Sequence, residues 1–278
     1  MALKLVKPIQ HKQLRTFKRG RVNIQREVRQ QQRLRNSLEK SVYRNLHRTI
    51  SKVINTKTYL YREYGFFDEL NTAKTFEEEI LPIMFVHYQK VFRTIFDHNE
   101  ETYSSINKSA EAMIFGRNYD LERLIEVYNK GRLLFLSGIS SRLANKIANI
   151  ITTGRDAGLS LTAIAKSISS AALPIGRSRA ALIARTETHN AASYAHHQYH
   201  GVLQENLGLN MKKRWTATSD DRTRSAHNEA NGQIVDMNSK FIVGGAEMEH
   251  AGDPSGGARN NVNCRCVIIY ADAEDIVL

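Results

Sequence analysis

The spacing of apolar residues predicts that the first two hundred residues are built mainly from long helices. Between residues 13 and 61 there is no proline and a single glycine, Gly20, and most positions hold strong helix formers. Apolar side chains recur there at steps of four or three, which places them on one side of a helix, at Leu34, Leu38, Val42, Leu46, Ile50 and Val53. A basic ridge runs beside them at Lys40, Arg44, Arg48 and Lys52. The pattern predicts an amphipathic, basic helix.

The next helical pattern, over residues 76–96, has an unusually wide apolar face. One stripe holds Phe76, Ile80, Met84, His87 and Val91, and its neighbour holds Leu81, Phe85, Tyr88, Phe92 and Phe96. A helix with such a face must be buried by other helices. Thr75 and Glu78 have capping-box spacing before this run, and Pro82 would move the start of the helix one turn later. We interpret His87 as a core histidine with hydrogen-bond partners.

Further helices are predicted up to residue 208. The first covers 120–152, either unbroken or interrupted near Gly131 or Gly138, and a short one covers 160–169. A linker with Pro174 and Gly176 is expected over 172–177. Ser178 then predicts the N-cap of a helix that reaches about residue 206, with Gly208 as its C-terminal stop.

The last hundred residues differ in kind, because turn signals and short strand patterns replace the helical spacing. Strands are predicted over 212–217, around Ile234 and over 264–270, with a helix over 219–230 and a loop over 251–258. The expected fold class is therefore a mostly α N-terminal region followed by a small α+β C-terminal domain. We expect three segments: a basic helical arm over 1–60, a helical body over 61–177 and the α+β domain over 178–278.

The charge of the chain is concentrated in the arm. The net charge is +12, with 40 Lys and Arg against 28 Asp and Glu. Residues 1–60 contain 16 basic residues and only two acidic ones, Glu27 and Glu39, so this segment alone carries +14. Clustered cations without acidic neighbours are typical of segments that bind a polyanion through its phosphates. A mitochondrial transit peptide, a membrane-surface helix and a solvated helix face are the alternatives.

We predict that the arm contacts double-stranded DNA without sequence specificity. The candidate nucleic-acid-binding residues are Arg15, Lys18, Arg19, Arg21, Arg26, Arg29, Arg33, Arg35, Lys40, Arg44 and Arg48. An acidic protein surface is the alternative partner. The longest apolar run, over residues 80–86, is far below the roughly 20 residues of a membrane-spanning helix. We therefore expect no membrane span, and no secretory signal, because polar and basic residues follow the first six.

The two cysteines, Cys264 and Cys266, are the most informative metal-ligand pattern in the sequence. Two cysteines one residue apart cannot form a disulfide framework, which favours a reducing compartment. On a strand they would point to the same side and could share a zinc ion. His227, His250 and Asp253 are the candidates for further ligands, and we name His227, Cys264 and Cys266 as the tentative metal set. The alternative is a pair of small buried residues.

Two other clusters have weaker signals. His196 and His200 are four residues apart on a predicted helix, but we interpret them as helix-surface residues because no Glu lies between them in a metalloprotease arrangement. Asp220, Asp221, Arg222, Arg224 and His227 lie within eight residues and could act on a phosphodiester. Capping and ion-pair contacts on a short helix explain the same spacing.

Several of these residues form an ordered series that resembles the phage Mu protein F-like, or phage head morphogenesis, family. The series consists of ARTET at 184–188, Trp215, DDRTR at 220–224, His227, NGQ at 231–233, Phe241, GDP at 252–254 and NCRC at 263–266. The resemblance covers about residues 178–278. The family-motif positions are Arg185, Glu187, Trp215, Asp221, Arg222, Arg224, His227, Gly232, Asp253, Cys264 and Cys266.

The resemblance implies a minor head protein of a tailed bacteriophage, associated with the portal and procapsid during head assembly. It implies other phage head proteins as partners and a place inside the virion head, after assembly in the host cytoplasm. It also implies that the protein is not an enzyme and has no established cofactor. Zinc is a candidate only because of the cysteine and histidine residues named above. The alternative is a phage-encoded nuclease or DNA-processing factor that uses His227 and the nearby Asp and Arg residues.

Overall fold

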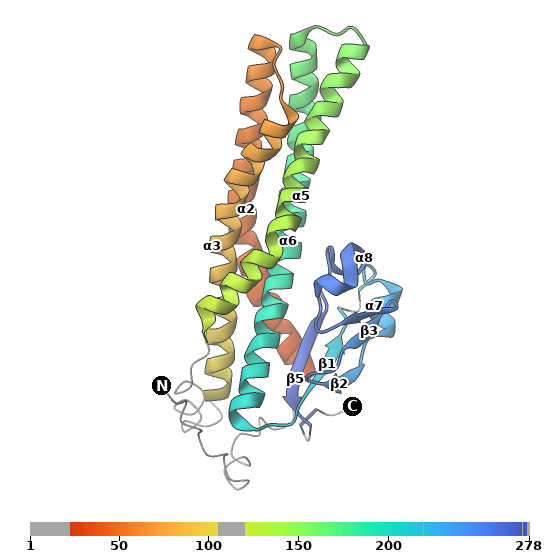
Figure 1. The fold of residues 1–278 in the computed structure, drawn as a ribbon. Helices are drawn as coiled ribbons and strands as arrows, with labels where there is room; N and C mark the ends of the chain where they lie inside the picture. Colours follow the sequence, from red (N-terminus) through yellow and green to blue (C-terminus); the bar gives the residue numbers. More distant parts are fainter. Residues whose placement is uncertain (1–22, 105–119, 219, 274, 277–278) are drawn as a thin grey trace. The chain divides into compact units, whose positions relative to one another are not determined.

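Four long helices followed by a small strand-containing region make up the described part of the chain (Figure 1). The structure, a computed structural model, describes residues 23–104, 120–218, 220–273 and 275–276. The helices are α2 (Ile24–Tyr64), α3 (Glu69–Ser104), α5 (Leu121–Asp156) and α6 (Leu161–Leu207). This architecture confirms the predicted fold class. Four predicted DNA contacts, Arg15, Lys18, Arg19 and Arg21, lie outside the described residues.

The residues group into two compact units that are interleaved along the chain. Unit 1 takes its described residues from Met1–Asn36, Val91–Leu121 and His189–Leu278, and unit 2 from Ser37–Lys90 and Glu122–Thr188. The sequence patterns instead suggested consecutive segments over 1–60, 61–177 and 178–278. The difference arises because α2, α3 and α6 are each continuous helices that contribute residues to both units.

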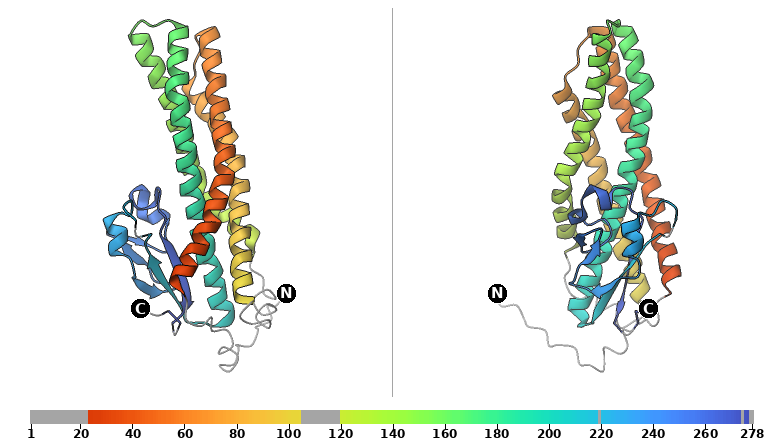
Figure 2. Two further views of the ribbon diagram at one scale, coloured as in Figure 1. Left: turned by 180° about the vertical axis from the view of Figure 1, so that it is seen from behind. Right: turned by 90° about the vertical axis from the view of Figure 1, so that its right-hand side faces the viewer.

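Unit 2 is held together by apolar residues from all four helices. Fully buried side chains line the facing sides of the helices, among them Leu46, Ile50, Ile80, Met84, Leu136, Ile147, Ile168 and Ile183. Gly176 allows a close helix contact, since a Cβ atom there would lie 2.9 Å from Ile54 Cδ1 and 3.0 Å from Ile50 Cγ2. Figure 2 shows the helices from two further sides.

Several predicted helix boundaries are wrong. The expected linker over 172–177 lies inside α6, where Pro174 is exposed while Ala172 and Gly176 are buried against the core. Packing of these small residues outweighs the hydrogen bond that the proline removes. Helix α3 begins at Glu69 rather than near Thr75, because the Asp68 carboxylate accepts a hydrogen bond from the Asn71 N–H at 2.9 Å. Helix α5 passes unbroken through Gly131 and Gly138.

The strands lie in unit 1. Strands β2 (Ile234–Asp236), β1 (Met211–Thr216) and β5 (Val267–Asp272) form an antiparallel sheet in the order β2-β1-β5, in which Trp215 is paired with Ile268. Strands β3 (Phe241–Val243) and β4 (Ala246–Met248) form a hairpin. Its turn is Gly244 and Gly245, both with positive φ, and a Gly-Gly pair is a typical signal of a two-residue hairpin turn.

The strand-containing region corrects three further predictions. The helix expected over 219–230 is only α7 (Ser225–Glu229), and residue 219 lies outside the described part of the chain. The loop expected over 251–258 contains a 3-10 turn, η2 (Pro254–Gly256), followed by α8 (Gly257–Asn261). Cys264 and Cys266 precede β5 instead of lying on it. Their mutual position is therefore set by a loop and not by the alternation of a strand.

No helix in the described ranges has an apolar stretch long enough to cross a membrane. The described part of α3, which carries the longest apolar run, is instead buried by its neighbours through residues such as Phe76, Ile80 and Met84.

His87 is the core histidine that the sequence predicts, and it makes unit 2 sensitive to acid. Its Nε2 lies 2.7 Å from Thr188 Oγ1, and burial, with a contribution from the Lys90 charge, lowers the pKa of His87 to about 4. Because the unfolded chain binds the proton at about pH 6.5, stability is intact above that pH and falls towards pH 4.

We expect His87 to account for a loss of about 3 kcal/mol between these pH values. Thermal or urea unfolding of wild type and His87→Gln between pH 4 and 7 measures it. Burial also lowers the pKa of His250 to about 4, so more than one residue contributes to the pH dependence of wild-type stability. The difference in pH dependence between wild type and His87→Gln isolates the contribution of His87. If stability depended on pH equally in both proteins, His87 would not be the source of the acid sensitivity.

Candidate functional site

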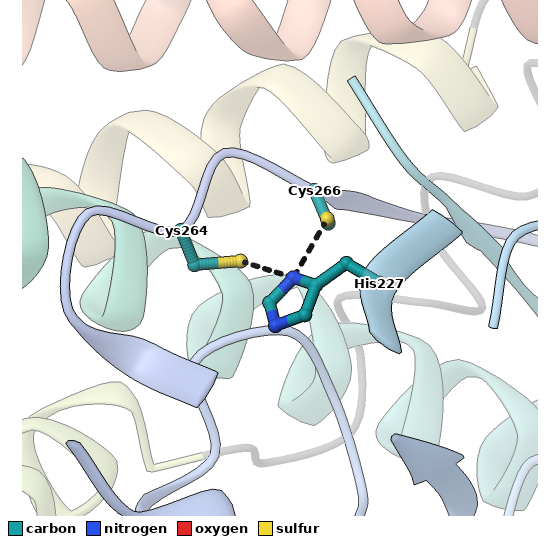
Figure 3. A group of neighbouring side chains, drawn as sticks. All are labelled: His227, Cys264 and Cys266. Carbon is teal, nitrogen blue, oxygen red and sulfur yellow. Dashed lines mark hydrogen bonds between the residues drawn. The ribbon is translucent and has the colours of Figure 1, made fainter. Parts of the chain in front are cut away.

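Three potential metal ligands meet in the interior of unit 1. His227 comes from α7, and Cys264 and Cys266 come from the loop before β5 (Figure 3). All three are buried, and their ligand atoms lie within 4.8 Å of one another. His227 Nδ1 lies 3.3 Å from Cys266 Sγ and 3.7 Å from Cys264 Sγ. The structure therefore brings together the three residues that the sequence named as the tentative metal set.

Local backbone geometry explains how both cysteines reach the same histidine. The chain turns back after α8, where the Cys264 N–H donates to the Asn261 carbonyl at 3.1 Å and Asn263 has a positive φ of 58°. Asparagine tolerates this left-handed conformation better than most residues. Arg224 Nη2 donates to the Val262 carbonyl at 2.5 Å and holds the turn against the segment that leads into α7. The family-motif residue Arg224 thus positions the cysteine loop.

Arg35 and His189 stand next to this cluster. Arg35 Nη1 donates to His189 Nδ1 at 3.0 Å and to the Cys266 carbonyl at 3.2 Å. Its Nη2 donates to Ser193 Oγ and Gln31 Oε1. Arg35 is only 7% exposed, and burial lowers the pKa of its guanidinium to about 10. The prediction that Arg35 contacts DNA is therefore wrong, because its side chain is committed to the interior.

The surroundings of the thiols favour one thiolate. Hydrogen bonding from Cys266 is the largest influence that lowers the pKa of Cys264, against the opposing effect of burial, and His189 and His227 lower it further. The pKa of Cys266 is raised by its hydrogen bond with Cys264, by burial and by the Cys264 charge. The hydrogen bond between the two thiols therefore lowers the pKa of Cys264 and raises that of Cys266.

The other proposed ligands lie elsewhere. His250 Nδ1 lies 3.2 Å from the Ala251 carbonyl, and its ring packs against Tyr194 and His197. The Asp253 carboxylate accepts from the backbone N–H groups of Ser255 and Glu249. Neither residue belongs to the cluster, because the loop geometry directs each to a local partner.

The two histidines of α6 are not on the surface. His196 and His200 are 1% and 3% exposed. His196 Nδ1 lies 3.1 Å from Asn99 Nδ2, and His200 stacks on Tyr270 with ring centroids 4.2 Å apart. The interpretation of helix-surface residues is wrong, because this stretch of α6 is buried on several sides.

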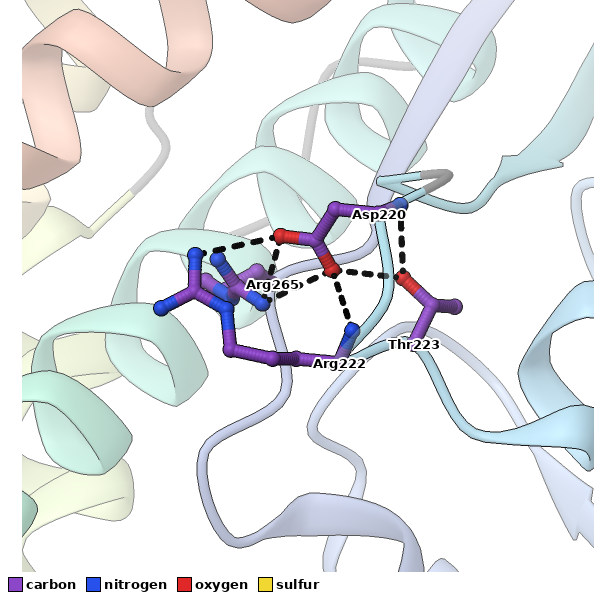
Figure 4. A network of polar contacts seen from close by, with 4 residues as sticks. All are labelled: Asp220, Arg222, Thr223 and Arg265. Carbon is purple, nitrogen blue, oxygen red and sulfur yellow. Dashed lines mark hydrogen bonds and ion pairs between the residues drawn. The ribbon is translucent and has the colours of Figure 1, made fainter.

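The polar residues 220–224 form a network of their own (Figure 4). Asp220 Oδ1 accepts from Arg265 at 3.0 Å and from the Arg222 N–H at 3.1 Å. Desolvation opposes ionisation of Asp220, but hydrogen bonds from Thr223 and Arg222 and the charge of Arg265 lower its pKa. Asp221 is exposed. The side-chain contacts described for His227 are with the cysteines and Trp215, so the structure does not assemble these residues as a phosphodiester-cleaving set.

The first family-motif segment, residues 184–188, lies in unit 2, where its Glu187 makes buried polar contacts. Glu187 is fully buried and accepts from Arg132 Nε at 2.9 Å and from Arg132 Nη2 at 2.5 Å. Tyr88 also donates its hydroxyl proton to Glu187, at 2.5 Å. Arg185 forms a half-buried ion pair with Glu39 at 3.3 Å. Gly232, with φ +85°, makes the turn before β2.

The exposed side of α2 carries the remaining predicted DNA contacts. In unit 1, Arg26, Arg29 and Arg33 are exposed, and in unit 2, Lys40, Arg44 and Arg48 are exposed. Among the described residues, no carboxylate forms an ion pair with any of these six. A shallow hollow on the unit 2 part is lined by Tyr43, Arg44, His47, Arg48, Ser51, Lys52, Asn55 and Thr56. We call the unit 2 cations Lys40, Arg44, Arg48 and Lys52 the basic face.

Sequence reasoning missed Arg35, His189 and Arg132 as partners of the motif residues. His189 directly follows the ARTET segment, so its position in the series was a usable signal. No spacing rule links Arg35 to Cys266 or Arg132 to Glu187, because these contacts join residues far apart in the chain.

Comparison with known proteins assigns the class. Residues 145–269 match the family described as phage Mu protein F like protein. The chain is 32% identical over 130 residues to minor head protein GP7 of Bacillus phage SPP1, covering 46% of this chain and 41% of that protein. It is 30% identical over 253 residues to NAD(+)–arginine ADP-ribosyltransferase EFV of Enterococcus faecalis, covering 82% of this chain and 50% of that protein. No solved structure matches.

The chain thus combines a helical N-terminal part with a small α+β region that carries the motif series, and that region is similar to phage head proteins. Residues 145–269 belong to the phage Mu protein F-like family, as the motifs predicted. The minor head protein among its relatives supports a place in the virion. The chain spans half or less of the length of these two curated relatives.

One expectation is overturned by the comparisons. The sequence analysis predicted that the protein is not an enzyme, whereas a relative that matches most of the chain is named an ADP-ribosyltransferase. The motif series could not reveal this, because the resemblance on which the expectation was based covered only the C-terminal third of the chain.

Proposed function

We propose that this protein is a portal-associated minor head protein whose basic helical segment contacts the packaged DNA without sequence specificity. The family match over residues 145–269 and the minor head relative support the head role. The observation that carries the DNA contact is the basic face, a row of exposed cations at helical spacing on α2. Partners in the portal and other head proteins follow from the same role.

The chemistry of the basic face suits a phosphate backbone. Lys40, Arg44 and Arg48 are exposed and free of described ion pairs, while Lys52 has only an exposed contact with Glu79 at 3.6 Å. Surface pairs of this kind are weak, so Lys52 remains available to a stronger anion. Cations in a row displace condensed counterions from DNA, which gives affinity that depends on salt and not on base sequence.

The basic face is tested best by charge removal, because α2 also supplies core residues such as Leu46 and Ile50 and cannot be deleted without damage to unit 2. We expect Arg44→Gln with Arg48→Gln to weaken binding to a DNA duplex and to reduce the slope of log K against log salt by about 2. Fluorescence anisotropy between low and moderate salt measures both quantities.

A matched control is available on α5. Arg142 and Lys146 are also exposed and also four residues apart, so Arg142→Gln with Lys146→Gln removes the same charge from another helix. We expect a change in slope near zero for this pair. An equal loss of DNA affinity in both double variants would contradict the DNA contact. So would the absence of DNA binding by wild type.

Portal association has its own test. We expect the full chain to co-purify with the portal protein of the same phage, and the Arg44→Gln and Arg48→Gln variant to keep that interaction. If the variant lost the portal and wild type bound no DNA, the acidic surface of a protein would be the partner of the basic face.

The ADP-ribosyltransferase relative makes enzymatic activity the second candidate function. Its identity of 30% extends over 253 residues, far beyond the motif region. Incubation of the purified chain with labelled NAD+ and an arginine-containing acceptor protein tests it directly. Label on the acceptor would establish the activity for this chain, and the absence of transfer over a range of acceptors would argue that the activity of the relative depends on the part that this chain does not span.

A further inference from the structure

We propose that Cys264, Cys266 and His227 bind one zinc ion, and that Arg35 and His189 hold the ligands from outside. The site lies within unit 1 and is independent of the proposed DNA contact. Sulfur and imidazole nitrogen are the donors that zinc takes in proteins. The proposal joins the metal set named from the sequence to two neighbours that only the structure reveals.

The separations between ligand atoms fit a tetrahedral zinc ion. With Zn–S bonds of about 2.3 Å and Zn–N bonds of about 2.0–2.1 Å, a tetrahedral site places nitrogen and sulfur roughly 3.6 Å apart. The observed distances from His227 Nδ1 to the two sulfur atoms are 3.3 and 3.7 Å. One nitrogen that faces two sulfur atoms at nearly equal distance is the arrangement that a shared ion requires (Figure 3).

The structure also argues against a disulfide as the purpose of the cysteine pair. Both thiols are free, and both point towards the histidine ring. The loop that carries them is fixed by backbone contacts at Asn261 and Val262, so the orientation of the thiols is built into the fold. The cluster is therefore preformed.

His189 acts as a neighbour of the metal and not as a ligand. Arg35 can only donate hydrogen bonds, so His189 Nδ1 must accept the bond at 3.0 Å. By accepting this bond, His189 orients the guanidinium that also donates to the Cys266 carbonyl. His189 also lies outside the group of ligand atoms that are within 4.8 Å of one another, which contains only His227, Cys264 and Cys266 among the described residues.

Arg35 ties the cluster to α2. Its guanidinium donates to the Cys266 carbonyl and to His189, and its positive charge favours the thiolate form that metal binding needs. Outer residues of this kind orient the ligands and typically change metal affinity ten- to a hundredfold when they are replaced. The site leaves one tetrahedral position for a ligand from outside the three residues.

The first experiment needs no substitution. We expect the full chain, purified under reducing conditions without chelator, to contain about one zinc per chain by inductively coupled plasma mass spectrometry. After exchange with cobalt(II), thiolate-to-metal charge-transfer absorption should appear in the near ultraviolet. A folded protein, verified by circular dichroism, that contains no zinc and takes up no cobalt would overturn the proposal.

Substitutions then locate the site. Cys264→Ser, Cys266→Ser and His227→Asn should each lose most of the bound zinc and change the cobalt spectrum. His250→Asn is the matched control, because His250 is equally buried in the same region but lies outside the cluster. Retention of full zinc content and an unchanged cobalt spectrum in all three ligand variants would also overturn the proposal.

The role of His189 has a separate readout. We expect His189→Gln to keep stoichiometric zinc and the thiolate bands, but to lose the metal ten to a hundred times more readily in competition with a chelator. If the cobalt spectrum of this variant instead showed that the metal had one nitrogen ligand fewer, His189 would be a direct ligand. That result would contradict the assigned role.

Discussion

Glu187→Gln is expected to lower the free energy of unfolding of unit 2 by about 3–5 kcal/mol. Glu187 is completely buried and receives two hydrogen bonds from Arg132 and one from Tyr88. Glutamine keeps the shape of the side chain but leaves the Arg132 charge without its counter-ion in the interior. Removing one partner of a buried pair costs far more than the pair itself contributes, because the remaining charge cannot regain water.

Urea unfolding followed by circular dichroism measures this effect. The control is Glu126→Gln, which breaks the ion pair with Lys130 at 2.6 Å, where both side chains are more than half exposed. That change should cost no more than about 0.5 kcal/mol. Replacing both buried partners, Arg132→Met with Glu187→Leu, should recover much of the loss. A single variant as stable as wild type would show that the buried pair does not hold unit 2 together.

Trp215→Ala is expected to destabilise the strand-containing region by about 3–5 kcal/mol. Trp215 is fully buried in the central strand β1, and its ring packs edge-on against Phe241 and His227 at centroid distances of 5.4 and 5.7 Å. Alanine would leave a large cavity between the sheet, the β3–β4 hairpin and α7. Because this is the only tryptophan of the chain, unfolding must be followed by circular dichroism instead of fluorescence.

The control for Trp215 lies on the hairpin. Ile242 is 53% exposed on β3, so Ile242→Ala should change stability by no more than about 0.5 kcal/mol. Trp215→Phe, which keeps an aromatic ring in the same pocket, should lose less than Trp215→Ala. Similar stability of Trp215→Ala and wild type would mean that the pocket collapses without cost, contrary to the close packing of the three rings.

The helices and the motif series could be predicted from the sequence because their signals are local. The step of four between Leu38, Val42 and Leu46 sets one face of α2 whatever the rest of the chain does. Gly208 ends α6 with the positive φ that its position predicted. Local signals failed where packing outweighs them, as at Pro174, which the sequence placed in a linker and the structure places inside a helix.

The candidate site was predictable only in part. The pair Cys264 and Cys266 with His227 was named from residue chemistry alone, and the structure brings the three together. The reason given for it was wrong, because the cysteines lie in a loop and not on a strand. Arg35, predicted to contact DNA, is buried beside them, since the charge of a residue does not reveal which side of a helix the core occupies.

The sequence by itself determined the kind of protein: a helical region with its positive charge at the N-terminal end, and a C-terminal motif series that belongs to one phage family. These properties depend on residue type and short spacing. Only the tertiary structure decided which charges face water and which are buried, as Arg44 and Arg35 show on the same helix. It also decided which distant residues meet, as Glu187 and Arg132 do, because burial and long-range contact are properties of the packed chain and not of any segment of it.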